Sequence, residues 1–339
     1  MDNTGSRYVP YNERTGGESV IYFTRDLSPW GLEKIYNFVK DGISGRVAVK
    51  AHTGEAEGPN IVPPVWIKQL IERQLPGAAV VETNTYYEGS RYTTEQHRKS
   101  LEINGWNFCS VDITDAEGVA TLPVENGKWF KEMHVGKNLL NYDSLLTITH
   151  FKGHAMGGFG GSCKNLGIGC ADGRIGKAEI HTIPGSDDLW SITREEFMER
   201  MTESAKSVID RFSGHISFIN VMRNMSVSCD CEGKYAEPVK VPDVGIIAGF
   251  DILAVDNACV DIIYSLPMNG GAPLIERIES RHGHRQLSYM KELGMGNNRY
   301  KIMDVDNDCR EINAEEIASE ISPVWRPDVY NRFKGNNFV

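Results

Sequence analysis

A chain of 339 residues with 40% hydrophobic and 24% charged residues is long enough to bury a large core. Its formal net charge of −10 argues against a nucleic-acid partner or an anionic membrane surface, and it has no apolar run of about 18 residues that would span a membrane. The polar N-terminus does not look like a signal peptide. Seven cysteines, an odd number, are typical of reduced thiols. We therefore expect a cytoplasmic protein.

Apolar runs and amphipathic segments alternate along the chain. Strands are predicted at 19–23, 46–50, 78–81, 108–113, 145–149, 215–222 and 244–248, and helices at 30–39, 65–74, 93–105, after Thr193 and at 250–266. This alternation predicts an α/β fold, with a largely parallel sheet flanked by helices. Ligands bind outside the carboxyl ends of such strands, so we expect the site at that edge of the sheet.

The domain organisation is less clearly marked. Residues 1–18 are expected to form an arm, either disordered or draped over the rest, and residues 19–339 a single α/β domain. Two closely packed subdomains with a boundary near 185–190 are an alternative, although no linker composition marks this boundary. A homo-oligomer is a further possibility that the sequence leaves open.

Residues 144–181 carry the densest set of chemically versatile side chains. A strand at 145–149 is followed by seven glycines between Gly153 and Gly176. Glycine lets the backbone approach a ligand closely, at an entropic cost. We therefore predict a glycine-rich ligand-binding loop outside the core, the alternative being a solvated surface loop.

Imidazole and thiol groups in and beyond this segment predict a soft metal site for zinc, iron or nickel. The candidate ligands are His150, His154, Cys163, Cys170, His181, Cys229 and Cys231. The Cys-Asp-Cys spacing is tighter than the Cys-x₂-Cys that is usual for zinc. Inert buried thiols, and histidines that only bond to a substrate, are the alternatives.

Basic and polar side chains near the strand ends predict a small anionic ligand, because Arg forks onto carboxylates and Lys acts as a point charge. The candidates for anion binding are Lys50, His52, Glu82, Asn84, Arg91, His97 and Asn165. The catalytic candidates are His150, Lys152, His154 and Lys164, the histidines as ligands or general acid–base groups and the lysines as holders of the anion or cofactor. The glycines match neither a Walker loop nor a dinucleotide fingerprint.

Several motifs resemble the bacterial and archaeal domain of unknown function 362, a family often labelled an iron–sulfur centre protein. They are HFKGHAMGGFGGSCKNLGIGC at 150–170, ETNTYYEGSRYTTEQH at 82–97, VKAHTGE at 49–55 and CDC at 229–231. Many members carry a ferredoxin-like insert with Cys-x-x-Cys-x-x-Cys runs after the histidine that matches His181. This chain runs on directly and has no Cys-x-x-Cys, so a ferredoxin-type cluster has no ligand set here.

The chain is also similar to the nickel-pincer lactate racemase family, which has a histidine, a glycine-rich turn, a cofactor-holding lysine ten residues after the histidine, and a later histidine. His154, Lys164 and His181 approximate this pattern. The leading hypothesis is an enzyme that acts on a small anionic substrate with the help of a metal or metal cofactor. The alternatives are a non-catalytic metal, iron–sulfur or cofactor carrier, and a racemase or isomerase resembling lactate racemase.

Overall fold

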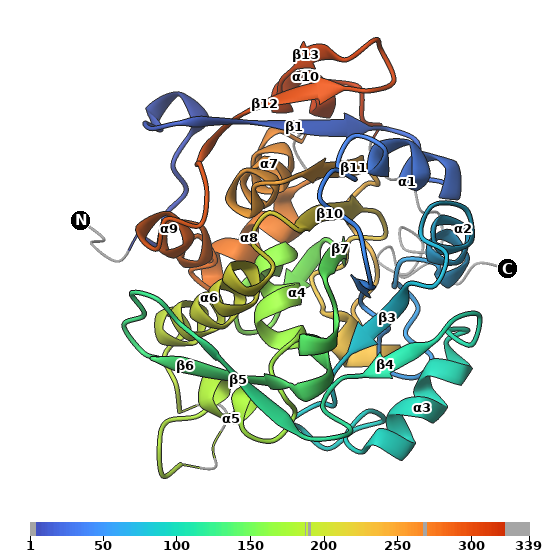
Figure 1. Ribbon diagram of the computed structural model, residues 1–339. Helices are drawn as coiled ribbons and strands as arrows, with labels where there is room; N and C mark the ends of the chain where they lie inside the picture. Colours follow the sequence, from blue (N-terminus) through green and yellow to red (C-terminus); the bar gives the residue numbers. More distant parts are fainter. Residues whose placement is uncertain (1–4, 187, 189–190, 267–269, 323–339) are drawn as a thin grey trace, which may run out of the picture.

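The computed structural model describes residues 5–186, 188, 191–266 and 270–322 (Figure 1). Its main sheet contains β1 (Glu18–Thr24), β2 (Val47–Lys50), β3 (Ala79–Glu82), β4 (Val111–Ile113), β7 (Ser144–His150), β10 (Ile216–Met222), β11 (Gly245–Gly249), β12 (Arg299–Asp304) and β13 (Arg310–Ile312). Two hairpins lie outside this sheet: β5 (Val119–Pro123) with β6 (Glu132–Gly136), and β8 (Lys152–His154) with β9 (Gly158–Gly160).

The strand order of the main sheet is β13-β12-β1-β11-β10-β7-β2-β3-β4. The block from β10 to β4 is parallel, as is the pair β1–β12. In contrast, β11 runs antiparallel to both β1 and β10, and β13 runs antiparallel to β12. The prediction of a largely parallel α/β sheet is therefore confirmed. The central strands of the parallel block are buried along their whole length, which explains their continuous apolar runs.

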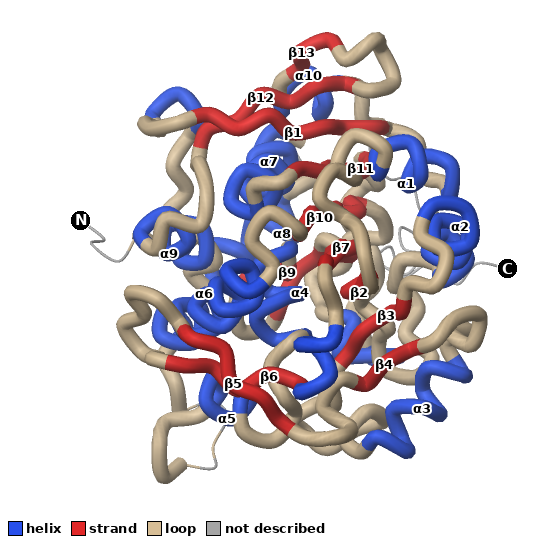
Figure 2. Tube along the Cα trace, in the orientation of Figure 1, coloured by secondary structure: helices blue, strands red, loops and turns tan. Residues whose placement is uncertain are grey.

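Helices cover both faces of the sheet, each over its own apolar core (Figures 1 and 2). One face carries α1 (Pro29–Tyr36), α2 (Pro64–Gln74) and α3 (Thr94–Ile103). The other carries α4 (Ser162–Gly169), α5 (Gly176–His181), α6 (Arg194–Arg211), α7 (Ile252–Ser265), α8 (Ala272–Ser280), α9 (Arg285–Glu292) and α10 (Ala314–Ser319). Short 3₁₀ helices are η1 (Tyr11–Glu13), η2 (Lys137–Asn141) and η3 (Asp230–Tyr235).

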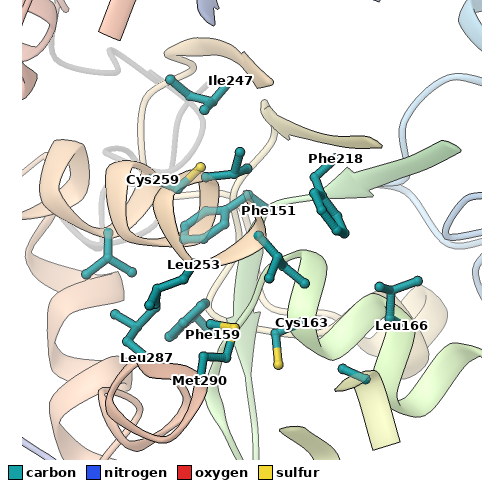
Figure 3. Packing of buried hydrophobic residues seen from close by; sticks show 14 of the residues in the cluster. Phe151, Phe159, Cys163, Leu166, Phe218, Ile247, Leu253, Cys259, Leu287 and Met290 are labelled. Atoms are coloured by element: carbon teal, nitrogen blue, oxygen red, sulfur yellow. The ribbon is translucent and has the colours of Figure 1, made fainter. Parts of the chain in front are cut away.

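Much of the glycine-rich segment is core, and the prediction of a loop outside the core is wrong there. Phe151, Phe159, Cys163 and Leu166 are fully buried in the apolar core that also contains side chains of α7 and α9 (Figure 3). Asp256 accepts hydrogen bonds from the backbone N–H groups of residues 162 and 163, at 2.8 and 3.0 Å. Two otherwise unpaired donors at the start of α4 are thereby satisfied.

The N-terminal arm is draped over the domain, one of the two expected arrangements. Tyr8 stacks on Tyr264 with ring centroids 4.0 Å apart, and Arg14 forms a buried ion pair with Asp261 at 2.6 Å. No helix among the described residues is long and apolar enough to cross a membrane. The alternative boundary near 185–190 falls largely outside the described residues.

Candidate functional site

A small cavity lies at the carboxyl edge of the parallel block. Lys50 at the end of β2 is in register with Val81 of β3 and Thr147 of β7, so the segments that follow these strands meet there. The cavity measures ≈ 100 Å³, several times the space that one water needs. Of the predicted site residues, its walls contain Lys50, His52, Glu82, Arg91, His154, Lys164, Asn165, His181, Cys229 and Cys231.

Lys50 and Glu82 form a buried ion pair in one wall. Lys50 Nζ donates to Glu82 Oε2 at 2.8 Å, while the backbone N–H and the hydroxyl of Thr53 donate to Oε1 at 3.0 and 2.9 Å. Burial would raise the pKa of Glu82, but Lys50 and Arg91 outweigh it and hold this pKa at about 2. Arg91 is itself paired with Glu55 at 2.8 Å. Lys50 and Arg91 are therefore already balanced by protein carboxylates.

His150 and Lys152 lie behind the wall and hold the Cys-Asp-Cys turn through Asp230. His150 Nδ1 is 2.9 Å from Asp230 Oδ1, and its Nε2 is 2.7 Å from the carbonyl oxygen of Arg223. Lys152 Nζ lies 3.3 Å from Asp230 Oδ2. Because both ring nitrogens of His150 have protein partners, this geometry does not fit the predicted role of His150 as a metal ligand or acid–base group. His150 and Lys152 instead position Asp230 and the Cys-Asp-Cys turn.

Two thiols flank Asp230 and face the cavity. Lys164 Nζ lies 3.6 Å from Cys229 Sγ. The hydrogen bond from Cys231, together with Lys164 and Lys152, holds the pKa of Cys229 well below its usual value. The same bond to Cys229, together with burial, raises the pKa of Cys231. Cys229 is therefore the thiol of the pair that loses its proton more readily.

His154 completes a group of three metal-ligand types. One donor atom each from His154, Cys229 and Cys231 lies within 4.8 Å of the others. Burial, with Lys164 and Lys152 nearby, keeps the pKa of His154 well below its usual value, so the imidazole is neutral. Two thiols and a neutral imidazole are soft donors that suit zinc, iron or nickel. Three protein ligands leave a coordination position for substrate or water.

The backbone N–H of Gly157 limits this fit. It donates to His154 Nδ1 at 3.0 Å, so the neutral ring carries its proton on Nε2. A metal on Nδ1 replaces this bond directly. A metal on Nε2 moves the proton to Nδ1, where it faces the Gly157 N–H. The donor set therefore fits a metal ion at the loss of one backbone hydrogen bond.

The structure does not bring Cys163 and Cys170 to this group. Both are buried in the large apolar core, where Figure 3 shows Cys163 beside Phe159. Burial raises the pKa of both thiols, that of Cys170 to about 12. Two protonated thiols in an apolar core, outside the cavity walls, do not fit the predicted ligand part.

Asn84 and His97 also lie outside the cavity walls. His97 Nδ1 is 3.3 Å from Asn84 Oδ1, and the amide of Asn84 donates to Thr94 and Asp115 at 3.0 and 3.2 Å. These contacts tie α3 to the loop after β3. The geometry gives both residues a structural part, in place of the predicted contact with an anion.

Three predicted residues bring neutral polar groups to the cavity. His52 lies 3.1 Å from Lys152 Nζ, and burial keeps the pKa of His52 well below its usual value. His181 Nδ1 lies 2.7 Å from the carbonyl oxygen of Lys177, and burial lowers the pKa of His181 to about 4. Since a carbonyl only accepts, the His181 proton is on Nδ1, and Nε2 is an acceptor with no hydrogen-bond donor among the residues that the structure describes. Asn165 Oδ1 has no hydrogen-bond partner among the described residues.

Sequence reasoning did not select Lys177, which also lines the cavity. It lies in α5, four residues before His181 and inside the glycine-rich segment. That spacing places the two residues about one helical turn apart. The signal was therefore available once the segment was read as helical.

A sequence profile described as "Domain of unknown function (DUF362)" matches residues 47–261. The chain belongs to the DUF362 family. The matched range contains the three soft donors and Lys164, Lys177 and His181, so the cavity described above belongs to the family domain. No curated protein matches this DUF362 chain in sequence.

Two solved structures show distant likeness. One is the lactate racemase apoprotein from Thermoanaerobacterium thermosaccharolyticum, with a TM-score of 0.38 at 9% identity over 84% of this chain and 82% of that chain. The other is a protein from Thermotoga maritima, with a TM-score of 0.33 at 15% identity over 75% and 57%. These values are too low to carry an argument about the site.

Proposed function

We propose that this DUF362 protein is a metal-dependent enzyme that acts on a small anionic substrate. The observation that carries the proposal is the placement of His154, Cys229 and Cys231 beside Lys164 on the walls of one small cavity. A metal held by these three ligands would supply a Lewis acid with an open position. The cavity volume of ≈ 100 Å³ favours a small substrate over a nucleotide.

The chain's own residues divide the work around this position. Lys164 balances the Cys229 thiolate and offers a cation to the substrate anion. The Nε2 atom of His181 is unprotonated at neutral pH, because the ring proton lies on Nδ1 and is donated in a hydrogen bond to the carbonyl oxygen of Lys177. It is therefore the residue best prepared to accept a proton from a bound substrate. Asp230, through His150 and Lys152, fixes the turn that presents both thiols.

Metal content measured after anaerobic purification tests the proposal. We expect the parent protein to hold one equivalent of a soft divalent metal per chain. The Cys229→Ser and Cys231→Ser variants should lose it, while Cys109→Ser, a change to a thiol outside the cavity walls, should retain it. A parent without metal, or equal content in all four proteins, would contradict the assignment.

Turnover separates an enzyme from a carrier of metal, an iron–sulfur group or another cofactor, since a carrier can use the same three ligands. The metal-loaded protein should convert a member of a panel of small carboxylates and phosphate esters. Stoichiometric metal with no turnover of the panel would favour the carrier. For the racemase or isomerase alternative, the supporting observation is that His154, Lys164 and His181 line one cavity. It predicts interconversion of the two enantiomers of a 2-hydroxy acid, measured by chiral chromatography.

A further inference from the structure

Lys177 is a buried cation on the cavity wall whose protein partners are neutral. Its Nζ donates to Thr83 Oγ1 at 2.7 Å and to the carbonyl oxygen of Asn84. The residue is 5% exposed. Among the residues that the structure describes, no carboxylate oxygen lies within 4.0 Å of this ammonium group.

The other cations of the cavity wall have anionic partners. Lys50 pairs with Glu82 and Arg91 with Glu55, each at 2.8 Å, while Lys164 lies 3.6 Å from the Cys229 sulfur. An ammonium taken out of water without a counter-ion is costly. Lys177 therefore differs from its neighbours in having a place for an anion that the protein does not fill.

The two carboxylates that act electrostatically on Lys177, Asp115 and Glu82, already accept hydrogen bonds from other groups. Asp115 accepts from the backbone N–H groups of residues 84 and 173, at 3.0 and 2.8 Å, and Glu82 is occupied by Lys50 and Thr53. Burial, aided by Arg91 and Lys50, lowers the pKa of Lys177 to about 8, and Asp115 and Glu82 only partly offset this decrease. A bound anion would reverse this shift.

We propose that Lys177 binds a second acidic group of the substrate, so that the ligand of this site is a short dianion such as a dicarboxylate. One acidic group lies against Lys177 and the other toward Lys164 and the thiols. His181 lines the same cavity as both lysines. This inference rests on the proposed function and specifies its substrate class.

Calorimetric titration of metal-loaded protein with malonate and with acetate tests the inference. We expect the parent to bind malonate more tightly than acetate by about 10- to 100-fold, as for a hydrogen bond to a charged group. Lys177→Gln should lose this preference, and Lys177→Arg should keep part of it. Lys99→Gln, at an exposed lysine on α3, is the matched control and should bind as the parent does.

A second readout separates binding from a merely structural role of the lysine. At about one pH unit above its pKa of about 8, free Lys177 is mostly neutral, so malonate binding should take protons from the buffer. Heats measured in buffers of different ionisation enthalpy report this uptake. Lys177→Arg should bind malonate without it, because arginine stays charged.

Two results would overturn the inference, and they are distinguishable. If Lys177→Gln binds malonate as tightly as the parent, and both proteins hold metal, the assignment of Lys177 fails while the proposed function stands. If the metal-loaded parent binds neither acid, the anionic substrate class fails, and both proposals fall with it. Circular dichroism of each variant confirms that the fold is retained in the comparison.

Discussion

Lys164 is the cation that contributes most to the low pKa of the Cys229 thiol, after the hydrogen bond from Cys231. Lys164 lies 3.6 Å away and helps to hold the pKa of Cys229 below its usual value. Lys164→Met should therefore raise this pKa and lower the fraction of Cys229 thiolate at a given pH. Thiolate absorbance of metal-free protein across pH, with Cys229→Ser subtracted as the blank, measures it. Lys99→Met should leave the titration unchanged, and an unshifted Lys164→Met curve would contradict the pairing.

Glu82 makes a pH-dependent contribution to stability. Its pKa is about 2 in the folded protein, against an ordinary value of 4.5. The folded state therefore favours the carboxylate, and its contribution is fully present above pH 4.5 and is lost as pH falls from 4.5 through 2. Glu82→Gln also leaves the buried Lys50 without its anionic partner, with the carbonyl oxygen of Ala51 still accepting from it. It should lower the free energy of unfolding at pH 7 by about 3–5 kcal/mol.

Urea denaturation at a series of pH values checks this prediction. The difference between the parent and Glu82→Gln should shrink below pH 4.5, since the parent loses its ion pair there. Glu95→Gln, at the exposed partner of Lys99, should show no measurable change at any pH. A constant difference between parent and Glu82→Gln down to pH 2 would rule out the ion pair as the cause.

Site residues were predicted correctly from the sequence where their position at the end of a strand decides which way the side chain points. Lys50 and Glu82 end apolar strands, and parallel strands bring such ends to one edge. The prediction failed where the turn of a helix decides which way a side chain points. In α4, Cys163 and the C-cap Cys170 point into the core, while Lys164 lines the cavity. Without knowledge of that helix, all three residues had equal claims on the site.

At the scale of elements, α4 is one of the helices that sequence patterns missed, together with α5, α8, α9 and α10. Glycine is a poor helix former, and four of the ten residues from Gly160 to Gly169 are glycine. The helix is instead supported by tertiary contacts. Asp256, from α7, caps its first turn, and Gly167 lies so close to α6 that a Cβ would come within 2.2 Å of the Met201 carbonyl oxygen. Such support comes from far along the chain and leaves no local signal.

Gly153 in β8 lies in close contact with the backbone that precedes the Cys-Asp-Cys turn. A substitution there tests whether this contact sets the position of the turn. A Cβ there would lie 2.2 Å from the carbonyl oxygen of Val227, two residues before Cys229. Gly153→Ala should therefore displace this turn, at a cost of about 1–3 kcal/mol, and weaken metal retention. Gly160→Ala, in the paired strand β9, is the control because its Cβ meets nothing closer than 3.6 Å.

Thermal denaturation and metal content of the two alanine variants give the answer. Gly153→Ala should melt lower and hold less metal, and Gly160→Ala should match the parent in melting temperature. If both variants behave alike, backbone contact at residue 153 does not set the position of the thiols.

At the scale of the whole molecule, sheet order was only partly predictable. Strand–helix alternation correctly gave the parallel block from β7 to β4, since right-handed crossovers connect such strands. It gave no sign that β11 runs antiparallel between β10 and β1, or that β12 pairs with β1. The first strand, β1, pairs with β11 and β12, which lie more than 200 residues further along the chain. Such long-range pairing is set by tertiary packing, and no local sequence pattern encodes it.

The N-terminal arm is attached to α7 by one buried ion pair, between Arg14 and Asp261. Both nitrogens of the Arg14 fork contact Asp261, at 2.8 and 2.6 Å, and the two side chains are 2% and 4% exposed. Arg14→Met leaves this carboxylate with only the hydroxyls of Tyr8 and Tyr300 as partners. We expect the free energy of unfolding to fall by about 3–5 kcal/mol, because an unpaired buried charge remains.

Urea denaturation measures this loss, and Arg7→Met, at an exposed arginine of the same arm, should change stability by less than about 0.5 kcal/mol. Combining Arg14→Met with Asp261→Asn removes the uncompensated charge, so the double variant should recover part of the loss. If the Arg14→Met protein is as stable as the Arg7→Met protein, the arm does not fasten the domain. Metal content should stay at the parent value in all these variants, because the ion pair is formed by the arm and α7 and neither residue lines the site cavity.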